Sequence, residues 1–172
     1  MKVAETQRLI LRQFSVDDAE QMFLLNSDPE VIKYTGDPAF KNTSEARSFL
    51  ENYNQYQKYG FGRWAVTEKM SGAFLGWCGL KYDPNIDQTD IGFRFFRKHW
   101  NKGFATESAS ASLILGFGLY NQQTIVGRAM KENTASIKVL EKLGMAFESE
   151  FDFYRGHGGV IYRIDKENFQ TL

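Results

Sequence analysis

The sequence predicts an α+β fold of the mixed α/β kind, in which a mixed sheet of about seven strands carries helices on both faces. Apolar runs of strand length recur along the chain, and other segments repeat their apolar residues at helical spacing. These elements follow one another in the order βαα-βββ-αβαββ. Near the centre of the chain, a strand, a basic loop with a glycine and a helix stand in direct succession.

The N-terminal part of the chain carries one expected strand and two expected helix starts. Arg8–Phe14 roughly alternates apolar and polar residues, which predicts the first strand. Ser15 is expected to cap a helix, with Asp18 completing a variant of the capping box. A short helix is expected at Asp28-Pro29, because aspartate caps helices well and proline suits their first position.

The next part is expected to form one helix and two strands. Thr43 or Ser44 starts the helix, and Gly60 ends it. The apolar stripe of this helix is Ala46, Phe49, Leu50, Tyr53 and Tyr56. The strands are expected at residues 62–68 and 73–82, as a hairpin.

The strand, loop and helix that follow predict an anion-binding site. Residues 91–96 form an apolar strand, and Arg97, Lys98 and Lys102 make the next loop basic. The first N–H groups of a helix have no partner inside it, and the helix dipole adds positive potential there. Gly103 has no β-carbon, so a phosphate can approach the backbone at this point.

The C-terminal part is expected to hold three strands and one helix. A strand at 124–130 leads to a helix that Asn133 caps. The last two strands, at 146–154 and 160–165, are expected to pair across a turn at residues 155–159.

Two motifs resemble the GNAT family of N-acetyltransferases. Trp100-Asn101-Lys102-Gly103-Phe104-Ala105 is similar to the family's acyl-CoA loop, Gln/Arg-x-x-Gly-x-Gly/Ala, except at its first position. The run ENTASIKVLEKLGM, at 132–145, is similar to a signature of the branch that resembles the ribosomal-protein N-acetyltransferases RimJ and RimL. The start ETQRLILRQF also fits, so the resemblance spans nearly the whole chain and implies one GNAT domain over residues 1–172.

The resemblance implies a GNAT-like α/β/α fold whose mostly antiparallel sheet is splayed between the fourth and fifth strands. A bulge around Phe95 would interrupt the pairing there, so that freed backbone groups can pair with the pantetheine of acetyl-CoA. The residues implied to bind this co-substrate are Phe95, Arg97, Trp100, Lys102, Gly103, Phe104, Ala105, Thr106, Asn133, Ser136 and Lys142.

The resemblance also implies two catalytic groups. The Phe95 N–H would donate to the thioester oxygen as an oxyanion donor. Many GNAT enzymes protonate the leaving thiolate with a tyrosine at the position that Leu140 occupies here, and leucine has no proton to give. The hydroxyl of Ser136, a water or another tyrosine is then left for this step. Asn133 is implied to contact pantetheine, and capping alone is the alternative.

The residues leave the general base open. The candidate carboxylates are Asp90, Glu148 and Glu150. His99 has the most suitable intrinsic pKa, but its place in the basic loop favours packing or phosphate contact, and His157 is expected in an exposed turn. Glu107 falls in the first turn of a helix, where a carboxylate suits the dipole, and this favours a structural role.

The acceptor is expected to be a primary amine. Deprotonating a lysine-type amine of pKa near 10.4 at pH 7 costs about 4.6 kcal/mol, whereas an α-amine of pKa near 7.8 costs about 1 kcal/mol. This favours a protein N-terminus, in line with the RimJ/RimL resemblance. The alternatives are a small amine, such as a polyamine or an antibiotic, and a CoA-binding module without catalysis. A polyamine is expected to bind in a pocket lined with carboxylates, and Asp83, Asp87 and Asp90 could form part of one.

Composition excludes several other classes. Lys+Arg and Asp+Glu are both 21, so no net field favours nucleic acid or an anionic membrane. The single cysteine, Cys78, is expected to be a buried inert thiol, and no Cys/His spacing predicts a metal site. Without a long apolar run or a signal-peptide pattern at the N-terminus, we expect a cytoplasmic protein. The oligomeric state stays open, a homodimer included.

Overall fold

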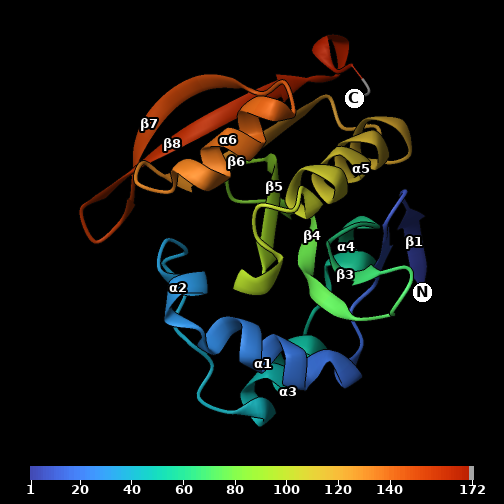
Figure 1. Cartoon of the computed structure of the whole chain (residues 1–172). Helices are drawn as coiled ribbons and strands as arrows, with labels where there is room; N and C mark the ends of the chain where they lie inside the picture. The colour runs from blue at the N-terminus through green and yellow to red at the C-terminus, as the bar shows by residue number, and fades with distance from the viewer. Residues whose placement is uncertain (171–172) are drawn as a thin grey trace.

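The computed structural model describes residues 1–170 and contains an eight-stranded sheet in the order β1-β2-β3-β4-β5-β6-β8-β7 (Figure 1). The strands are β1 (Lys2–Glu5), β2 (Leu9–Arg12), β3 (Arg63–Glu68), β4 (Phe74–Asp83), β5 (Gln88–Phe95), β6 (Thr124–Met130), β7 (Ala146–Tyr154) and β8 (His157–Asp165). The helices are α1 (Ala19–Ser27), α2 (Pro29–Ile32), α3 (Thr43–Glu51), α4 (Gln55–Tyr59), α5 (Phe104–Gly118) and α6 (Thr134–Lys142). Three short 3-10 helices span Val16–Asp18, Arg97–His99 and Lys166–Asn168. The predicted mixed α/β fold is confirmed.

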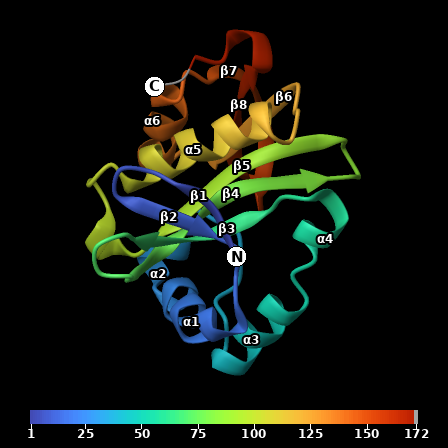
Figure 2. The same ribbon diagram turned by 90° about the vertical axis from the view of Figure 1, so that its right-hand side faces the viewer.

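The helices cover both faces of this sheet. In Figure 2, α5 and α6 lie over one face, and α1, α2 and α3 lie below the other. The main core fills the space between α5 and the sheet, with Leu80, Leu113 and Ile125 fully enclosed. A smaller core, which includes Met22 and Leu50, joins α1 to α3.

The structure corrects three expected boundaries. A strand that the sequence did not reveal, β1, pairs with β2, so the sheet has eight strands and not about seven. The single helix expected up to Gly60 is two helices, because the backbone leaves helical geometry at Asn52, the C-cap of α3, whose side-chain amide donates to the Ser48 carbonyl. The last turn is shorter than residues 155–159, since Tyr154 already pairs with His157 and places His157 in β8.

The expected capping residues are largely confirmed. Ser15 and Asp18 form the reciprocal capping box, although the element that they begin is a 3-10 turn leading into α1. The Asp28 side chain caps α2, and Asn133 caps α6 by accepting a hydrogen bond from the Ser136 N–H. These caps depend on neighbours three residues apart or fewer, which is why the sequence reveals them.

The sheet parts between β5 and β6. These two strands run parallel, but they pair only at Asp90↔Val126 and Ile91↔Gly127. From there β5 stays with β4 as far as Gly76↔Phe95, and β6 stays with β8 as far as Met130↔Gly159. The predicted splay is therefore present, and each half of the sheet is continuous up to the gap.

The cause proposed for the splay was wrong, because Phe95 does not lie in a bulge. The register between β4 and β5 is unbroken from Asp83↔Gln88 to Gly76↔Phe95. The irregular step lies one strand further away, at Val66/Thr67 between β3 and β4. The gap follows from the pairing of β5 with β4 and of β6 with β8, since the two halves twist apart beyond their short junction.

The helix α6 lies very close to β6, and the Leu140 side chain fills the space between them. A β-carbon built on Gly127 would come 2.5 Å from Leu140 Cδ2. Leu140 is 2% exposed, so this side chain is part of the core. At the position where the resemblance implies a tyrosine, Leu140 packs the helix against the sheet.

We predict that Gly127→Ala destabilises the fold by about 1–3 kcal/mol, because the added methyl group overpacks the contact with Leu140. Urea denaturation would measure this change. The matched control is Gly118→Ala at the end of α5, where a β-carbon meets nothing within 4 Å. An equal loss of stability in the two variants would contradict the assigned contact.

Candidate functional site

The loop before α5 exposes backbone N–H groups, as the sequence predicts. Gly103 is the N-cap residue, has a left-handed φ of 81° and provides no side-chain cap. A β-carbon there would be strained and would lie 3.3 Å from Arg8 Nη2. The amides of Phe104, Ala105 and Thr106 therefore begin the helix without an intrahelical partner. This geometry suits an anion.

Glu107 ties this helix start to the turn between β1 and β2. Its Oε1 accepts hydrogen bonds from Thr6 Oγ1 at 2.6 Å and from the Arg8 N–H at 2.9 Å, and its Oε2 accepts from Arg8 Nε at 2.7 Å. Arg8 Nη1 also donates to the Lys102 carbonyl at 3.0 Å. Burial alone would raise the pKa of Glu107, but the hydrogen bonds from Thr6 and Arg8 lower it below its usual value. The structural interpretation of Glu107 therefore agrees with its contacts.

A cleft of about 550 Å³ runs from the start of α5 past the end of β5 to α6 and α2. Nine of the eleven residues that the resemblance assigns to acetyl-CoA line it: Phe95, Trp100, Gly103, Phe104, Ala105, Thr106, Asn133, Ser136 and Lys142. The volume lies within the range of about 300–1,000 Å³ that is usual for ligand pockets. The structure thus brings the two sequence motifs together around one space.

The other two residues, Arg97 and Lys102, do not line this cleft. Arg97 Nε donates to Asp28 Oδ2 at 2.8 Å, so the Arg97 side chain is paired with the N-cap residue of α2. The Lys102 side chain is exposed, and its carbonyl binds Arg8. Local sequence reveals the charge of a loop but not the direction in which the fold turns each side chain.

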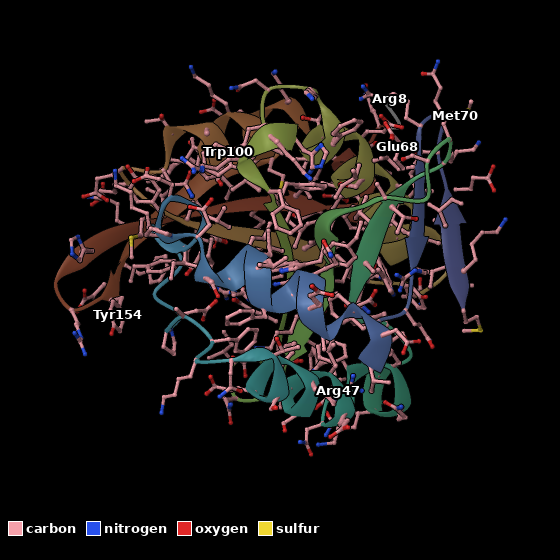
Figure 3. All side chains as sticks on the ribbon, turned by 60° about the horizontal axis from the view of Figure 1, so that its bottom comes forward. Arg8, Arg47, Glu68, Met70, Trp100 and Tyr154 are labelled. Carbon is pink, nitrogen blue, oxygen red and sulfur yellow. The ribbon has the colours of Figure 1, made fainter. Side chains whose placement is uncertain are left out.

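The free edge of β5 faces the gap between the two halves of the sheet. The Phe96 N–H donates to the Leu75 carbonyl at 3.1 Å, so the alternation of an antiparallel ladder turns the N–H and C=O of Phe93 and Phe95 away from β4. The Phe95 carbonyl accepts a hydrogen bond from Trp100 Nε1 at 2.7 Å. Figure 3 shows Trp100 at this loop. The Phe95 N–H therefore points into the gap.

The start of α6 forms the wall opposite α5. Asn133 Oδ1 accepts from the Ser136 N–H at 3.2 Å, so Asn133 is engaged as a cap. The half-buried Ser136 lines the cleft, and Lys138 and Lys142 line it further along the helix. Thr134 and Ser136 are the hydroxyl side chains at the start of α6 that line the cleft, whereas Leu140 is buried in the core.

The sequence did not reveal the wall that α2 and its following loop contribute. Glu30, Val31, Lys33, Tyr34 and Thr35 line the cleft there. No motif marks these positions; the only local signal was the Asp28-Pro29 helix start.

The sequence also did not reveal Arg94 as a residue of the cleft. It is 10% exposed, lines the cleft and donates to Asp37 Oδ2 at 2.7 Å and to Asn26 Oδ1. Burial lowers the pKa of Arg94, and the pairing with Asp37 opposes this shift. The guanidinium also lies 5.2 Å from the centre of the Trp77 ring. Arg94 therefore fixes the loop after α2 against β5.

The three candidate carboxylates for the base lie outside the cleft. Asp90 pairs with Arg63 at 2.6 Å. Glu148 pairs with Arg163 at 3.3 Å, and Glu150 pairs with Lys131 at 2.6 Å. The histidines differ: His99 lines the cleft, whereas His157 is an exposed strand residue. Burial and the neighbouring Lys98 and Lys102 lower the pKa of His99, which favours the neutral imidazole.

The charges on the cleft wall suit an anionic ligand. Among residues 1–170, the charged side chains that line it are the cationic Lys33, Arg94, Lys138 and Lys142 and the carboxylate of Glu30. Cys78 lies apart from it, fully buried, and burial raises the pKa of its thiol, in agreement with the expected inert role. Within residues 1–170, no group of three His, Cys, Asp or Glu side chains could hold a metal ion. No helix in the same range is long and apolar enough to span a membrane.

Comparison with known proteins identifies the family. The family model described as the acetyltransferase (GNAT) domain matches residues 8–146. The protein named "Uncharacterized N-acetyltransferase p20" of Bacillus licheniformis is 32% identical over 164 residues, which cover 94% of this chain and 92% of p20. A GNAT-family acetyltransferase from Bacillus anthracis has a crystal structure with a TM-score of 0.83 and 27% identity, covering 97% of this chain and 99% of its own. The chain belongs to the GNAT acetyltransferase family and is an N-acetyltransferase.

More distant structures share the fold with different acceptors in their names. A spermidine N-acetyltransferase from Vibrio cholerae, solved with CoA and spermine, has a TM-score of 0.80 at 18% identity and covers 95% of this chain and 98% of its own. A putative ribosomal-protein-serine acetyltransferase from the same organism has a TM-score of 0.76 at 17% identity and covers 96% and 97%. At these identities the likeness concerns the fold alone.

We predict that Glu107→Gln lowers the free energy of unfolding at pH 7 by about 2 kcal/mol, because it weakens hydrogen bonds that depend on a charged acceptor. The lowered pKa of Glu107 means that the ionised carboxylate stabilises the fold above the ordinary glutamate pKa. This contribution is lost as the pH falls through the lowered value. Urea denaturation of both proteins between pH 7 and pH 3 should therefore show a difference that shrinks only in acid. A difference independent of pH would contradict the role of the charge.

Proposed function

We propose that this enzyme uses acetyl-CoA and moves the acetyl group by direct attack of a primary amine, with a protein N-terminal α-amine as the acceptor. One observation carries the proposal: a single cleft joins the free amides of α5 to the open edge of β5 and to the start of α6. An acyl-CoA has an anionic head, an extended amide-bearing arm and a thioester, in that order. The cleft offers a matching wall for each part.

The donor would lie along this cleft from α5 to the gap. Its pyrophosphate would accept hydrogen bonds from the amides of Phe104, Ala105 and Thr106, with positive charge from Lys138 and Lys142 nearby. Its pantetheine amides would pair with the free edge of β5, as an added strand does. This arrangement would bring the thioester to Phe95 and Ser136.

The chemistry then needs an oxyanion donor and a proton for the sulfur. The Phe95 N–H points into the gap and would donate to the carbonyl oxygen as the nitrogen attacks; a fixed donor of this kind contributes about 3 kcal/mol. The new C–N bond forms and the C–S bond breaks. The thiolate would take its proton from the Ser136 hydroxyl, which recovers one from the nitrogen through water.

Two observations favour an α-amine over a polyamine. The acidic loop considered for polyamines lies at the far end of β5 from Phe95, and Asp87 and Asp90 there are bound by Tyr82 and Arg63. None of the three candidate carboxylates lines the cleft, which suits an acceptor whose deprotonation costs about 1 kcal/mol. The fold neighbours named for spermidine and for a ribosomal protein do not decide between these acceptors.

We predict that Gly103→Val weakens acetyl-CoA binding at least tenfold by calorimetry, because a β-carbon blocks the approach of phosphate to the backbone. Gly72→Val is the matched control, since Gly72 has a similar positive φ of 71° in the β3–β4 turn with open space around it. Unchanged affinity in a folded Gly103→Val, or equal weakening in the control, would contradict the placement of the pyrophosphate.

We also predict that Ser136→Ala lowers kcat by about a hundredfold while the KM for acetyl-CoA changes little, since general acid catalysis contributes about 10²–10⁴ in rate. Steady-state kinetics with a peptide acceptor would measure both constants. If kcat stays at the wild-type value, Ser136 has no part in the proton transfer. A wild-type protein that binds acetyl-CoA and acetylates no amine in a broad panel would instead indicate a binding module.

A further inference from the structure

A second hollow lies next to the cleft, between the segment after α2 and the β7–β8 hairpin. It has a volume of about 420 Å³, and Lys33, Tyr34, Asp37, Glu132, Tyr154 and His157 are among its lining residues. Figure 3 shows Tyr154 on this hairpin. Lys33 and Tyr34 line both spaces, so the hollow and the cleft share a wall.

The balance of charge changes across this wall. Within residues 1–170, the cleft has four cationic side chains and one carboxylate, whereas the hollow has two carboxylates, Asp37 and Glu132, and one lysine. A polyanionic donor therefore suits the cleft, and an ammonium group suits the hollow.

The two carboxylates of the hollow are not equivalent. Asp37 is held by Arg94 at 2.7 Å, so its charge is already balanced by a buried guanidinium. Glu132 is exposed and forms no side-chain hydrogen bond or ion pair with any of residues 1–170, and its neighbour Lys131 pairs with Glu150 instead. Glu132 is the acidic group of the hollow with an unused charge.

The position of Glu132 in the chain links it to the donor site. It lies between the end of β6 at Met130 and the α6 cap Asn133, whose side chain binds the Ser136 N–H. A group held by Glu132 thus approaches from the hollow, while Ser136 faces the cleft. The five residues from Glu132 to Ser136 would therefore contact both substrates.

We propose that Glu132 binds the ammonium group of the acceptor in this hollow and passes its proton to solvent before attack; this rests on the proposed function. The ammonium loses one proton through Glu132, the neutral nitrogen attacks the acetyl carbon, and the C–S bond breaks. The second proton lost by nitrogen ends on the sulfur. One unpaired carboxylate beside Tyr34, Tyr154 and Met130 suits a monocation with an apolar neighbour, such as a peptide N-terminus, better than a polyamine.

The test compares wild type with Glu132→Gln, using the peptide amide Ala-Tyr-Ala-NH₂ and spermidine as acceptor probes. We expect kcat/KM for the peptide to fall at least tenfold in Glu132→Gln, with acetyl-CoA affinity by calorimetry unchanged. Glu132→Asp should recover part of the loss. The matched control is Glu51→Gln, at an exposed carboxylate on the last turn of α3 that makes no side-chain hydrogen bond or ion pair with the other residues of the range 1–170.

The outcomes separate the inference from the function on which it rests. Unchanged kcat/KM in Glu132→Gln, or a loss of acetyl-CoA affinity of the same size, overturns the role of Glu132 while the wild-type activity stands. A wild type that prefers spermidine to the peptide overturns the monocation assignment. A wild type that acetylates neither probe, nor any amine in a wider panel, refutes the proposed function and this inference with it.

Discussion

The parting of β5 from β6 is the constraint on which the rest of the structure depends. Two paired positions join the halves of the sheet, and beyond them the edge of β5 has N–H and C=O groups with no strand beside them. Backbone groups in a protein interior need partners, so an open edge between two well-paired half-sheets is a place for a ligand with amides of its own. The Phe95 N–H is at the end of this edge, where the cleft meets α2.

The helices on either side of the gap are held by contacts outside it. The Glu107 carboxylate joins the first turn of α5 to Thr6 and Arg8, and Leu140 packs α6 against β6 at Gly127. These contacts hold the glycine loop before α5 and the Asn133 cap of α6 in place on the two sides of the cleft. Preorganised donors of this kind need little rearrangement when substrate binds, which is the main source of their catalytic value.

Local patterns predicted much of the fold and the helix starts that line the cleft. The capping box at Ser15, the cap at Asn133 and the loop before α5 each depend on residues adjacent in sequence. The missed features depend on contacts between distant segments: Arg97 turns to Asp28, and α2 supplies a wall that no motif marks. The bulge expected at Phe95 was wrong because a splay can arise from how two half-sheets twist, which a single strand does not encode.

The most direct measurement is a crystal structure of the protein with acetyl-CoA. The account predicts the diphosphate within hydrogen-bonding distance of the amides of residues 104–106 and the pantetheine paired with the free edge of β5. The thioester oxygen should lie near the Phe95 N–H. A diphosphate bound elsewhere, or β5 and β6 paired along their whole length with the ligand outside the gap, would contradict it.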